Sequence, residues 1–438
     1  MRKVYDDQHD PFWLRKVYDV DDGVKTDPSF VRFLAVDLSS SRAAAGITRI
    51  DLSGNSFAVD SAQALARALP IAGGLRSLVI GPRSTELTAS ASLNLCGQEL
   101  SASELTIVAA WLFSKACVSV DLSKNLISNT TVEHYTSGKV KHVTCVDADI
   151  SGIESLSSAK PVKELVLADC FMGPNAIAAL AACFSAIGLE KLDISRNSIT
   201  GGYINSAFDG RDKLAFVGTH ESGVTALAMA LPSSTITKLN FSCCGLGPKA
   251  MHILAATLPN TAIEELDISA NVPVGRNGSE EHGGDMSAWS TLCSSLGKSS
   301  IKRLIAAGCY LGPESVLMLA NAISTTKLDT VTLSDNPVTG GDDCFGDIGE
   351  GEDTRGITAL VTSLGDSQIK HLALSNCGVS EQAISMLIAI LDTPRLSTLD
   401  LSQNVDVFHC HDKEELKKAH PEVQIKLESV LFSIYIAK

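Results

Sequence analysis

The sequence predicts an α/β solenoid, a curved horseshoe with parallel β-strands on its concave face and helices on its convex face. One observation is a short apolar string that returns along most of the 438 residues. A second is a helix-start signal that follows every second string at a fixed offset. The composition agrees, because 45% hydrophobic residues can fill a core and 5% aromatics make that core aliphatic. Solenoids lengthen one continuous core, so this length does not require several domains.

Each string has three apolar places and then Asn or Cys at the ninth place, which is the leucine-rich-repeat template. Residues 47–55 show the Asn form, and residues 162–170 show the Cys form. The two forms alternate along the chain. The Asn-type anchors are Asn55, Asn125, Asn197, Asn271, Asn336 and Asn404, and the Cys-type anchors are Gln98, Cys170, Cys244, Cys309 and Cys377.

One step between anchors is fixed and the other varies. The step from a Cys-type anchor to the next Asn is always the same, from position i to position i+27 (98 to 125, 170 to 197, 244 to 271, 309 to 336, 377 to 404). The step from Asn to the next Cys-type anchor differs each time (55 to 98, 125 to 170, 197 to 244, 271 to 309, 336 to 377). The fixed step predicts a compact pair, and the variable step predicts insertions on one side of every second repeat.

Each repeat is predicted to run strand, turn, helix and return. The apolar places alternate with period two, as in a strand with one buried face. A Gly or Ser N-cap, in three cases followed by Pro, marks the helix starts. A buried Asn at the ninth place can satisfy loop N–H and C=O groups that no strand reaches. The helix starts are Ser101, Gly173-Pro174, Gly247-Pro248, Gly312-Pro313 and Ser380.

This alternation resembles the ribonuclease-inhibitor-like family of leucine-rich-repeat proteins, in which Asn-type and Cys-type repeats each carry a helix. The resemblance covers roughly residues 47–404 and implies the fold more than the function. The chain departs from the family in its long variable step. We also predict an extra short repeat over residues 140–150, between Asn125 and Cys170, with little room for a helix.

Four segments are predicted: an N-terminal extension (1–26), a cap helix (27–46), about 11–12 repeats (47–407) and a C-terminal cap (408–438). Insertions at residues 201–220, 274–286 and 339–355 follow Asn-type strands, and a fourth, at 82–92, interrupts a strand. Equivalent positions should place these insertions along one edge of the solenoid. Such loops either bind partners or only decorate the scaffold.

Charge and cysteine content limit the partners and the compartment. A net charge of −14 argues against nucleic-acid and anionic-membrane surfaces. No apolar run is long enough to span a bilayer, and the segment 1–22 has no signal-peptide h-region. The 12 Cys are therefore expected to be reduced and buried, which predicts a cytoplasmic location, including a cytoskeletal or ciliary one.

Motifs for catalysis, cofactors and metals are missing, so we predict no enzyme, no cofactor and no metal site. The sequence has no Walker A string and no Gly-x-Ser-x-Gly. Carboxylates at 342–353 do not have EF-hand spacing, and His409-Cys410-His411 lacks the distant second ligand pair of structural zinc. Cys243-Cys244 has no His beside it in the sequence.

The candidate binding residues are an acidic row and several aromatics. The outward place of the Asn-type strands carries Asp in five repeats and Thr332 in the sixth, and these Asp are either partner-binding or a feature of the repeat consensus. Aromatics in the N-terminal extension are either docking anchors or part of a cap. The predicted partner is another protein with a basic surface. The candidates are Asp51, Asp121, Asp193, Asp267, Asp400, Phe12, Trp13, Tyr203 and Phe208.

These features predict a non-catalytic protein-interaction scaffold built from leucine-rich repeats, as a subunit of a larger cytoplasmic, cytoskeletal or ciliary assembly. The alternative is a regulator of a small GTPase. Ran GTPase-activating protein has a similar fold, but this analogy rests on fold alone. A third reading, a fragment of an innate-immune-type sensor, lacks the nucleotide-binding domain.

Overall fold

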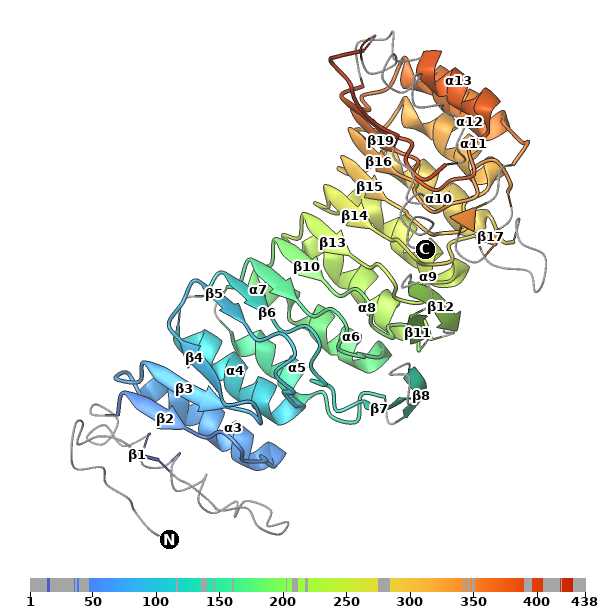
Figure 1. Cartoon of the computed structure of the whole chain (residues 1–438). Coiled ribbons are helices and arrows are strands. Elements are labelled where there is room, and N and C mark those ends of the chain that lie inside the picture. Colours follow the sequence, from blue (N-terminus) through green and yellow to red (C-terminus); the bar gives the residue numbers. More distant parts are fainter. Residues whose placement is uncertain are drawn as a thin grey trace, which may run out of the picture. The chain divides into compact units, whose positions relative to one another are not determined.

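The computed structural model of the chain divides into two compact units. The first comprises Met1–Ser198 with Ser233–Ile236, and the second Ile199–Pro232 with Thr237–Lys438. In each unit, short strands form one layer and helices cover one side of it (Figure 1). The structure describes residues 14–15, 35, 38, 47–115, 117–134, 140–144, 146–159, 161–201, 203–206, 212–216, 220–274, 284–341, 343–344, 347–348, 351–389, 396–404, 418 and 420–427.

The first unit contains two runs of strands. In one run β1 (Leu14–Arg15), β2 (Arg49–Asp51) and β3 (Ser77–Ile80) are parallel, and β4 (Thr85–Thr88) is antiparallel to β3. The first run ends at β4. The second run is parallel throughout, and its order is β5 (Ser92–Asn94), β6 (Ser119–Asp121), β9 (Glu164–Val166) and β10 (Lys191–Asp193).

The second unit contains one parallel run of seven strands, and adjacent strands pair residue for residue. The run is β13 (Lys238–Asn240), β14 (Glu265–Asp267), β15 (Arg303–Ile305), β16 (Thr330–Thr332), β19 (His371–Ala373), β20 (Thr398–Asp400) and β21 (Gln424–Lys426). The middle residue of each strand is buried, and the flanking two are half-buried or exposed. One face of the layer is therefore core and the other is surface.

Helices begin where the sequence predicts. Gly173, Gly247 and Gly312 are extended N-caps with Pro at the first helical position, and Ser101 forms a capping box with Glu104. From residue 47 on, the described α-helices of the first unit are α3 (Val59–Ala68), α4 (Ala102–Ser114), α5 (Ser151–Ser155), α6 (Pro174–Ala182) and α7 (Phe184–Ile187). Those of the second are α8 (Ser222–Ala230), α9 (Pro248–Thr257), α10 (Ser287–Leu296), α11 (Pro313–Ile323), α12 (Arg355–Leu364) and α13 (Glu381–Ala389).

Buried asparagines explain why the step from a Cys-type anchor to the next Asn is constant. Asn336 Oδ1 accepts the backbone N–H of Cys309 at 2.8 Å and of Leu311 at 3.0 Å. Its Nδ2 donates to the carbonyls of Ala306 and Leu333, at 2.7 and 2.9 Å. Asn197, Asn271 and Asn404 make the same set, which confirms the predicted role. Any other spacing would displace the amide from these groups.

The Cys-type anchors make weaker bonds in the other direction. The thiol of Cys309 donates to the carbonyl of Ile268 at 3.2 Å, and that of Cys377 donates to Leu333 at 3.1 Å. Each acceptor belongs to the preceding Asn-type repeat. Burial raises the pKa of Cys170 and of Cys309 to about 12, so these thiols stay protonated at neutral pH.

Alkaline pH should therefore destabilise the protein. An unfolded thiol ionises near the ordinary value of 9, whereas the folded Cys170 thiol resists ionisation up to about 12. The unfolded state then binds fewer protons between these values, and stability falls as pH rises through them. We expect urea midpoints to drop above pH 9, and to drop less in Cys170→Ala. An equal drop in both proteins would contradict this cause.

In every described repeat that has an Asn-type or Cys-type anchor, the residue just before the anchor adopts a left-handed backbone conformation. Only some of these residues are glycine, and others bear full side chains. The lysine at position 124 has φ 58°. The set is Gly54, Gly97, Lys124, Asp169, Arg196, Cys243, Ala270, Gly308, Asp335, Asn376 and Gln403.

Opposite substitutions at this place should have opposite effects. Lys124→Gly is expected to stabilise by about 0.5–1 kcal/mol, because a side chain with positive φ costs more than the entropy that glycine adds. Gly97→Ala should destabilise by about 1 kcal/mol, although no atom lies within 4 Å of the added Cβ. Urea midpoints of both variants measure this. Two shifts of the same sign would show that the backbone conformation is not the cause.

Two sequence predictions about the variable steps were wrong. Residues 140–144 form β8 (Val140–Thr144), which pairs antiparallel with β7 (Thr131–His134), while β6 pairs directly with β9. The expected extra repeat is therefore a hairpin insertion, and the helix α5 follows it. Residues 82–92 do not interrupt a strand, since they turn from β3 into β4 and lead to β5.

The β3 strand itself is a repeat strand that the sequence analysis missed. Its template residues Leu75, Leu78 and Ile80 are buried, but the place-nine residue is Arg83 and no helix follows. The predicted cap helix at 27–46 is described only at Ala35 and Leu38, which are helical and buried. The other segment boundaries remain predictions.

Candidate functional site

The predicted Asp residues all stand on the surface face of their strands, at the third strand position, and all are half-buried. Each carboxylate accepts the backbone N–H of a serine two positions further on, at 2.9–3.1 Å. This bond tightens the turn that leaves the strand. Each Asp therefore has a structural role, and its binding of a partner remains a prediction. The five are Asp51, Asp121, Asp193, Asp267 and Asp400.

The strand order keeps these Asp apart within each unit. In the first, Val166 stands between Asp121 and Asp193. In the second, β15, β16 and β19 separate Asp267 from Asp400. The carboxylates are thus not gathered into one acidic cluster within either unit.

The predicted aromatic anchors are only partly described. Phe12, Trp13 and Phe208 lie outside the described residues. Tyr203 begins β11 (Tyr203–Ser206), which pairs antiparallel with β12 (Asp212–Phe216). A further hairpin of the second unit joins β17 (Asp343–Cys344) to β18 (Asp347–Ile348). Both hairpins follow an Asn-type strand, as predicted for the insertions.

Hydrogen bonds fix the bases of the insertions. The carboxylate of Asp147 accepts N–H groups of Gly173, Asn175 and Ala176 at 2.8–2.9 Å, which caps α6 from outside its own repeat. In the second unit the hydroxyls of Thr200 and Thr339 donate to loop carbonyls at 2.8 and 2.6 Å. The insertions thus leave the scaffold from defined points.

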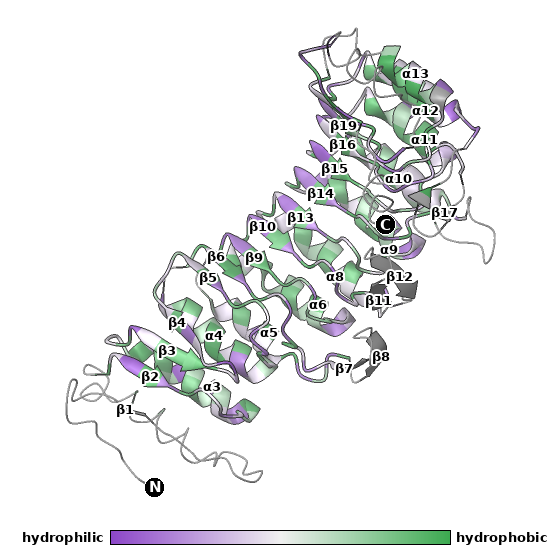
Figure 2. Cartoon of the chain, in the orientation of Figure 1, coloured by the Kyte–Doolittle hydropathy of each residue, from purple (hydrophilic) through white to green (hydrophobic). Residues whose placement is uncertain are grey.

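Ion pairs cover much of the strand face. In the second unit Glu265 accepts from Lys238 at 2.8 Å and from Arg303 at 3.4 Å. In the first, Lys191 lies 3.8 Å from Glu164. Figure 2 colours parts of β13, β14 and β15 purple, the hydrophilic end of its scale. These charges are largely solvated and neutralise one another, so each pair contributes about 1 kcal/mol or less.

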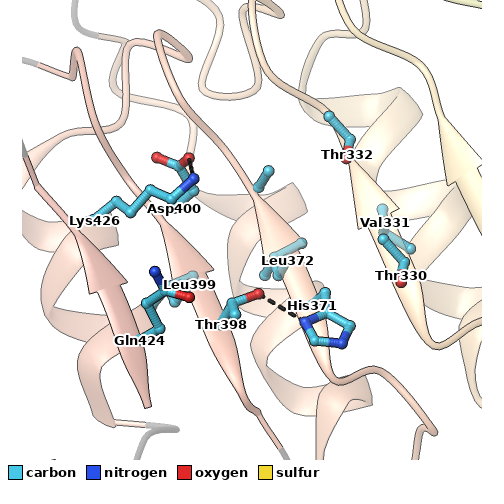
Figure 3. Close-up of a pocket in the computed structure, with 11 residues that line it drawn as sticks. Thr330, Val331, Thr332, His371, Leu372, Thr398, Leu399, Asp400, Gln424 and Lys426 are labelled. Atoms are coloured by element: carbon cyan, nitrogen blue, oxygen red, sulfur yellow. Dashed lines mark hydrogen bonds and ion pairs between the residues drawn. The ribbon is translucent and has the colours of Figure 1, made fainter.

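A different surface follows on the last four strands of the second unit. A depression of about 200 Å³ lies over β16, β19, β20 and β21 (Figure 3). Ala373 stands between Thr332 and Asp400 on the neighbouring strands, and its short side chain leaves the space open. The lining residues are Thr330, Val331, Thr332, His371, Leu372, Ala373, Thr398, Leu399, Asp400, Gln424 and Lys426.

Two contacts order the polar groups around this depression. His371 Nδ1 lies 2.9 Å from Thr398 Oγ1, which fixes the ring and the hydroxyl against each other. Lys426 Nζ lies 3.2 Å from Asp400 Oδ2, so the one cation and the one anion of the lining pair together. The depression therefore offers hydroxyl, imidazole and amide groups, and its one carboxylate is paired with its one lysine.

Sequence reasoning found only Asp400 among these residues. The sequence did contain a signal for the depression. The first residue of β13, β14 and β15 is charged, whereas the first residues of β16, β19 and β20 are Thr330, His371 and Thr398. Ala373 is also the smallest residue at the outward third position. The strand pairing that gathers these positions was needed to give the signal a meaning.

Metal binding finds no support in the described part of the chain. No group of three or more His, Cys, Asp and Glu side chains is placed to hold a metal there. The acidic segment at residues 342–353 is only partly described. Arg355 donates hydrogen bonds to the carboxylate of Asp353, and these bonds lower the pKa of Asp353. His409, Cys410 and His411 lie outside the described residues.

No described helix is long and apolar enough to cross a membrane.

Comparison with known proteins adds little beyond the fold. No family model matches the chain, and no curated protein matches it. Among solved structures it is similar to the crystal structure of a TLR13–ssRNA13 complex, with 16% identity and a TM-score of 0.35. The match covers 82% of this chain and 43% of that chain. The fold is a leucine-rich-repeat solenoid, as its strand ladders, helices and anchor asparagines show.

Proposed function

We propose that this protein is a non-catalytic protein-interaction scaffold whose contact surface includes the strand face of β16, β19, β20 and β21. The observation that carries the proposal is the depression over these strands. The backbone of these strands is fixed by parallel pairing and by the buried Asn336 and Asn404, which lie beneath the strand ends. A rigid surface with a hollow and exposed hydrogen-bonding groups suits protein recognition, because little order is lost on binding.

The chemistry of this surface favours a protein over a nucleic acid. Phosphate backbones are held by unpaired Lys and Arg, and bases stack on aromatic rings. Here the cation of the lining, Lys426, is paired with Asp400, and no Phe, Tyr or Trp lines the hollow. A partner that presents polar side chains or backbone amides matches these groups better.

The same residues support a non-catalytic role. His371 and Thr398 resemble a base and a hydroxyl nucleophile in spacing. In a catalytic triad a third group also orients the base, usually a carboxylate. In the described part of the chain no carboxylate hydrogen-bonds to the His371 ring. The pair therefore lacks the group that would activate it.

The finer parts of this proposal rest on the sequence. We propose membership of the ribonuclease-inhibitor-like class, which the alternating Asn and Cys anchors with a helix in most repeats support. We also propose a cytoplasmic location within a larger assembly, cytoskeletal or ciliary, which the many Cys and the scarcity of aromatics support. Cross-linking mass spectrometry in native extract tests the assembly. A protein recovered only as a free monomer would contradict it.

Site-specific photo-cross-linking tests the contact surface. A benzophenone amino acid at Thr398 should cross-link a partner in native extract, whereas the same probe at Thr362, exposed on α12, should not. Ala373→Leu fills the hollow and should abolish the Thr398 cross-link. Val166→Leu, at the same strand position in the first unit, should leave it intact. Equal cross-links from both probe positions, unaffected by Ala373→Leu, would reject this surface.

A further inference from the structure

We infer that the depression over β16–β21 receives an uncharged carboxamide, such as the side chain of an asparagine or glutamine on the partner. This inference rests on the proposed function and specifies what the partner places in the hollow. Asp400 is the one acid and Lys426 the one Lys or Arg among the lining residues, and they neutralise each other at 3.2 Å.

A charged ligand group would therefore enter without a free counter-charge. The Asp400 carboxylate also accepts the Ser402 N–H at 3.1 Å and the Ser402 hydroxyl at 2.6 Å, so both of its oxygens are engaged. A lysine or arginine side chain would have to displace Lys426. A carboxylate would compete with Asp400 for Lys426. Either charge would enter without an unpaired counter-charge among the lining residues, so neutral groups are preferred.

The remaining groups provide both donors and acceptors around the hollow. The Thr330 hydroxyl donates to Asp329 at 2.7 Å, which leaves its oxygen lone pairs to accept. Thr332 and Gln424 add a hydroxyl and a side-chain amide, and His371 adds the ring nitrogen Nε2 that faces away from Thr398. A carboxamide carries two N–H donors and one acceptor oxygen in one plane, so it can satisfy both kinds of group.

Size and shape separate the carboxamide from other neutral ligands. Drug-sized ligands occupy about 300–1,000 Å³, and this hollow of about 200 Å³ suits a single side chain. The rings of Phe, Tyr and Trp are the usual platform for a stacked nucleobase, and none of these three residue types lines the hollow. Sugars are also neutral and hydroxyl-rich, so a glycoside serves as a competing probe in the test.

The test uses small probes and the full-length chain. N-acetylglutamine methylamide is titrated into protein with labelled threonine methyl groups, and the Thr332 methyl signal is read by NMR, assigned with Thr332→Ser. We expect a saturable shift with about millimolar affinity, as for a ligand of this size. The isosteric glutamate probe and the lysine probe should bind at least fivefold more weakly. Methyl glucoside should bind no better than the charged probes.

Variants decide whether the shift comes from the hollow. Ala373→Leu should weaken the glutamine probe at least tenfold, and Val166→Leu should change its affinity less than twofold. Absence of saturation, tighter binding of a charged probe or of the glucoside, or indifference to Ala373→Leu would each overturn the carboxamide inference. If this titration fails while the Thr398 cross-link persists and still depends on Ala373, the scaffold proposal stands and only the ligand chemistry falls.

Discussion

Asn336→Ala is expected to destabilise the second unit by about 3–5 kcal/mol, because several buried polar groups lose their partners at once. The substitution leaves the buried N–H groups of Cys309 and Leu311 without their acceptor. It also removes the donor to the carbonyls of Ala306, Leu333 and Ser334. A buried polar group left unpaired costs about 1–3 kcal/mol, and alanine cannot reach any of these partners. Urea unfolding followed by circular dichroism measures the loss.

Two further variants make this measurement specific. Asn321, exposed on α11, provides the matched control, and Asn321→Ala should shift stability by less than about 0.5 kcal/mol. Asn336→Asp keeps the acceptor oxygens but sets a carboxylate against the carbonyls, so it should be no more stable than Asn336→Ala. If Asn336→Ala cost no more than Asn321→Ala, the asparagine would not be what ties the two repeats together.

Gly356→Val is expected to cost about 3 kcal/mol through overpacking, with Gly356→Ala intermediate. Gly356 lies in the first turn of α12, beside the first turn of α11. A Cβ at this position would lie 2.6 Å from the Pro313 carbonyl oxygen and 2.9 Å from Val316 Cβ. Backbone atoms cannot move aside as a flexible side chain can, so the helices must separate, and overpacking of this kind costs about 1–3 kcal/mol or more.

Gly365 supplies the control within the same helix. It caps the C-terminal end of α12 with φ −58°, and an added Cβ would meet only the Thr362 oxygen at 3.8 Å. Gly365→Ala should therefore be neutral or stabilise by several tenths of a kcal/mol, because it restricts the unfolded chain. Thermal unfolding of the three variants gives the order. A Gly356→Ala melting temperature equal to that of the native protein would show that the two helices adjust freely.

The repeat pattern predicted what depends on residues close in sequence. The anchors, the strand faces and the capped helix starts follow from local spacing, and the structure confirms them. A small residue at the second position of α5, α8, α10 and α12 was also visible in the sequence, as Gly152, Gly223, Ala288 and Gly356. Its meaning needed the contact between neighbouring helices, which the pattern alone does not give.

The missed features depend on distant residues. β3 has the apolar places of a repeat but no Asn or Cys anchor, and a hairpin with β4 follows it where other repeats have a helix. Residues 140–144 satisfy part of the apolar template, yet they pair with β7 because the neighbouring ladder position is already taken by β9. The depression joins strands from separate repeats, whose register places Thr330 beside His371 and His371 beside Thr398.

The buried asparagines also limit how such a gene can change in length. Outside their own repeats, Asn197, Asn271, Asn336 and Asn404 each bond to the Cys-type repeat before them, so the bonds that Asn336 makes to another repeat stay within the pair that contains Cys309 and Asn336. Losing that pair would leave Asn271 bonded to Cys244 and Asn404 bonded to Cys377. Losing one repeat of a pair would leave either the asparagine amide or the two backbone N–H groups of the Cys-type repeat without a hydrogen-bond partner. Duplications and deletions that persist should therefore carry two repeats at a time.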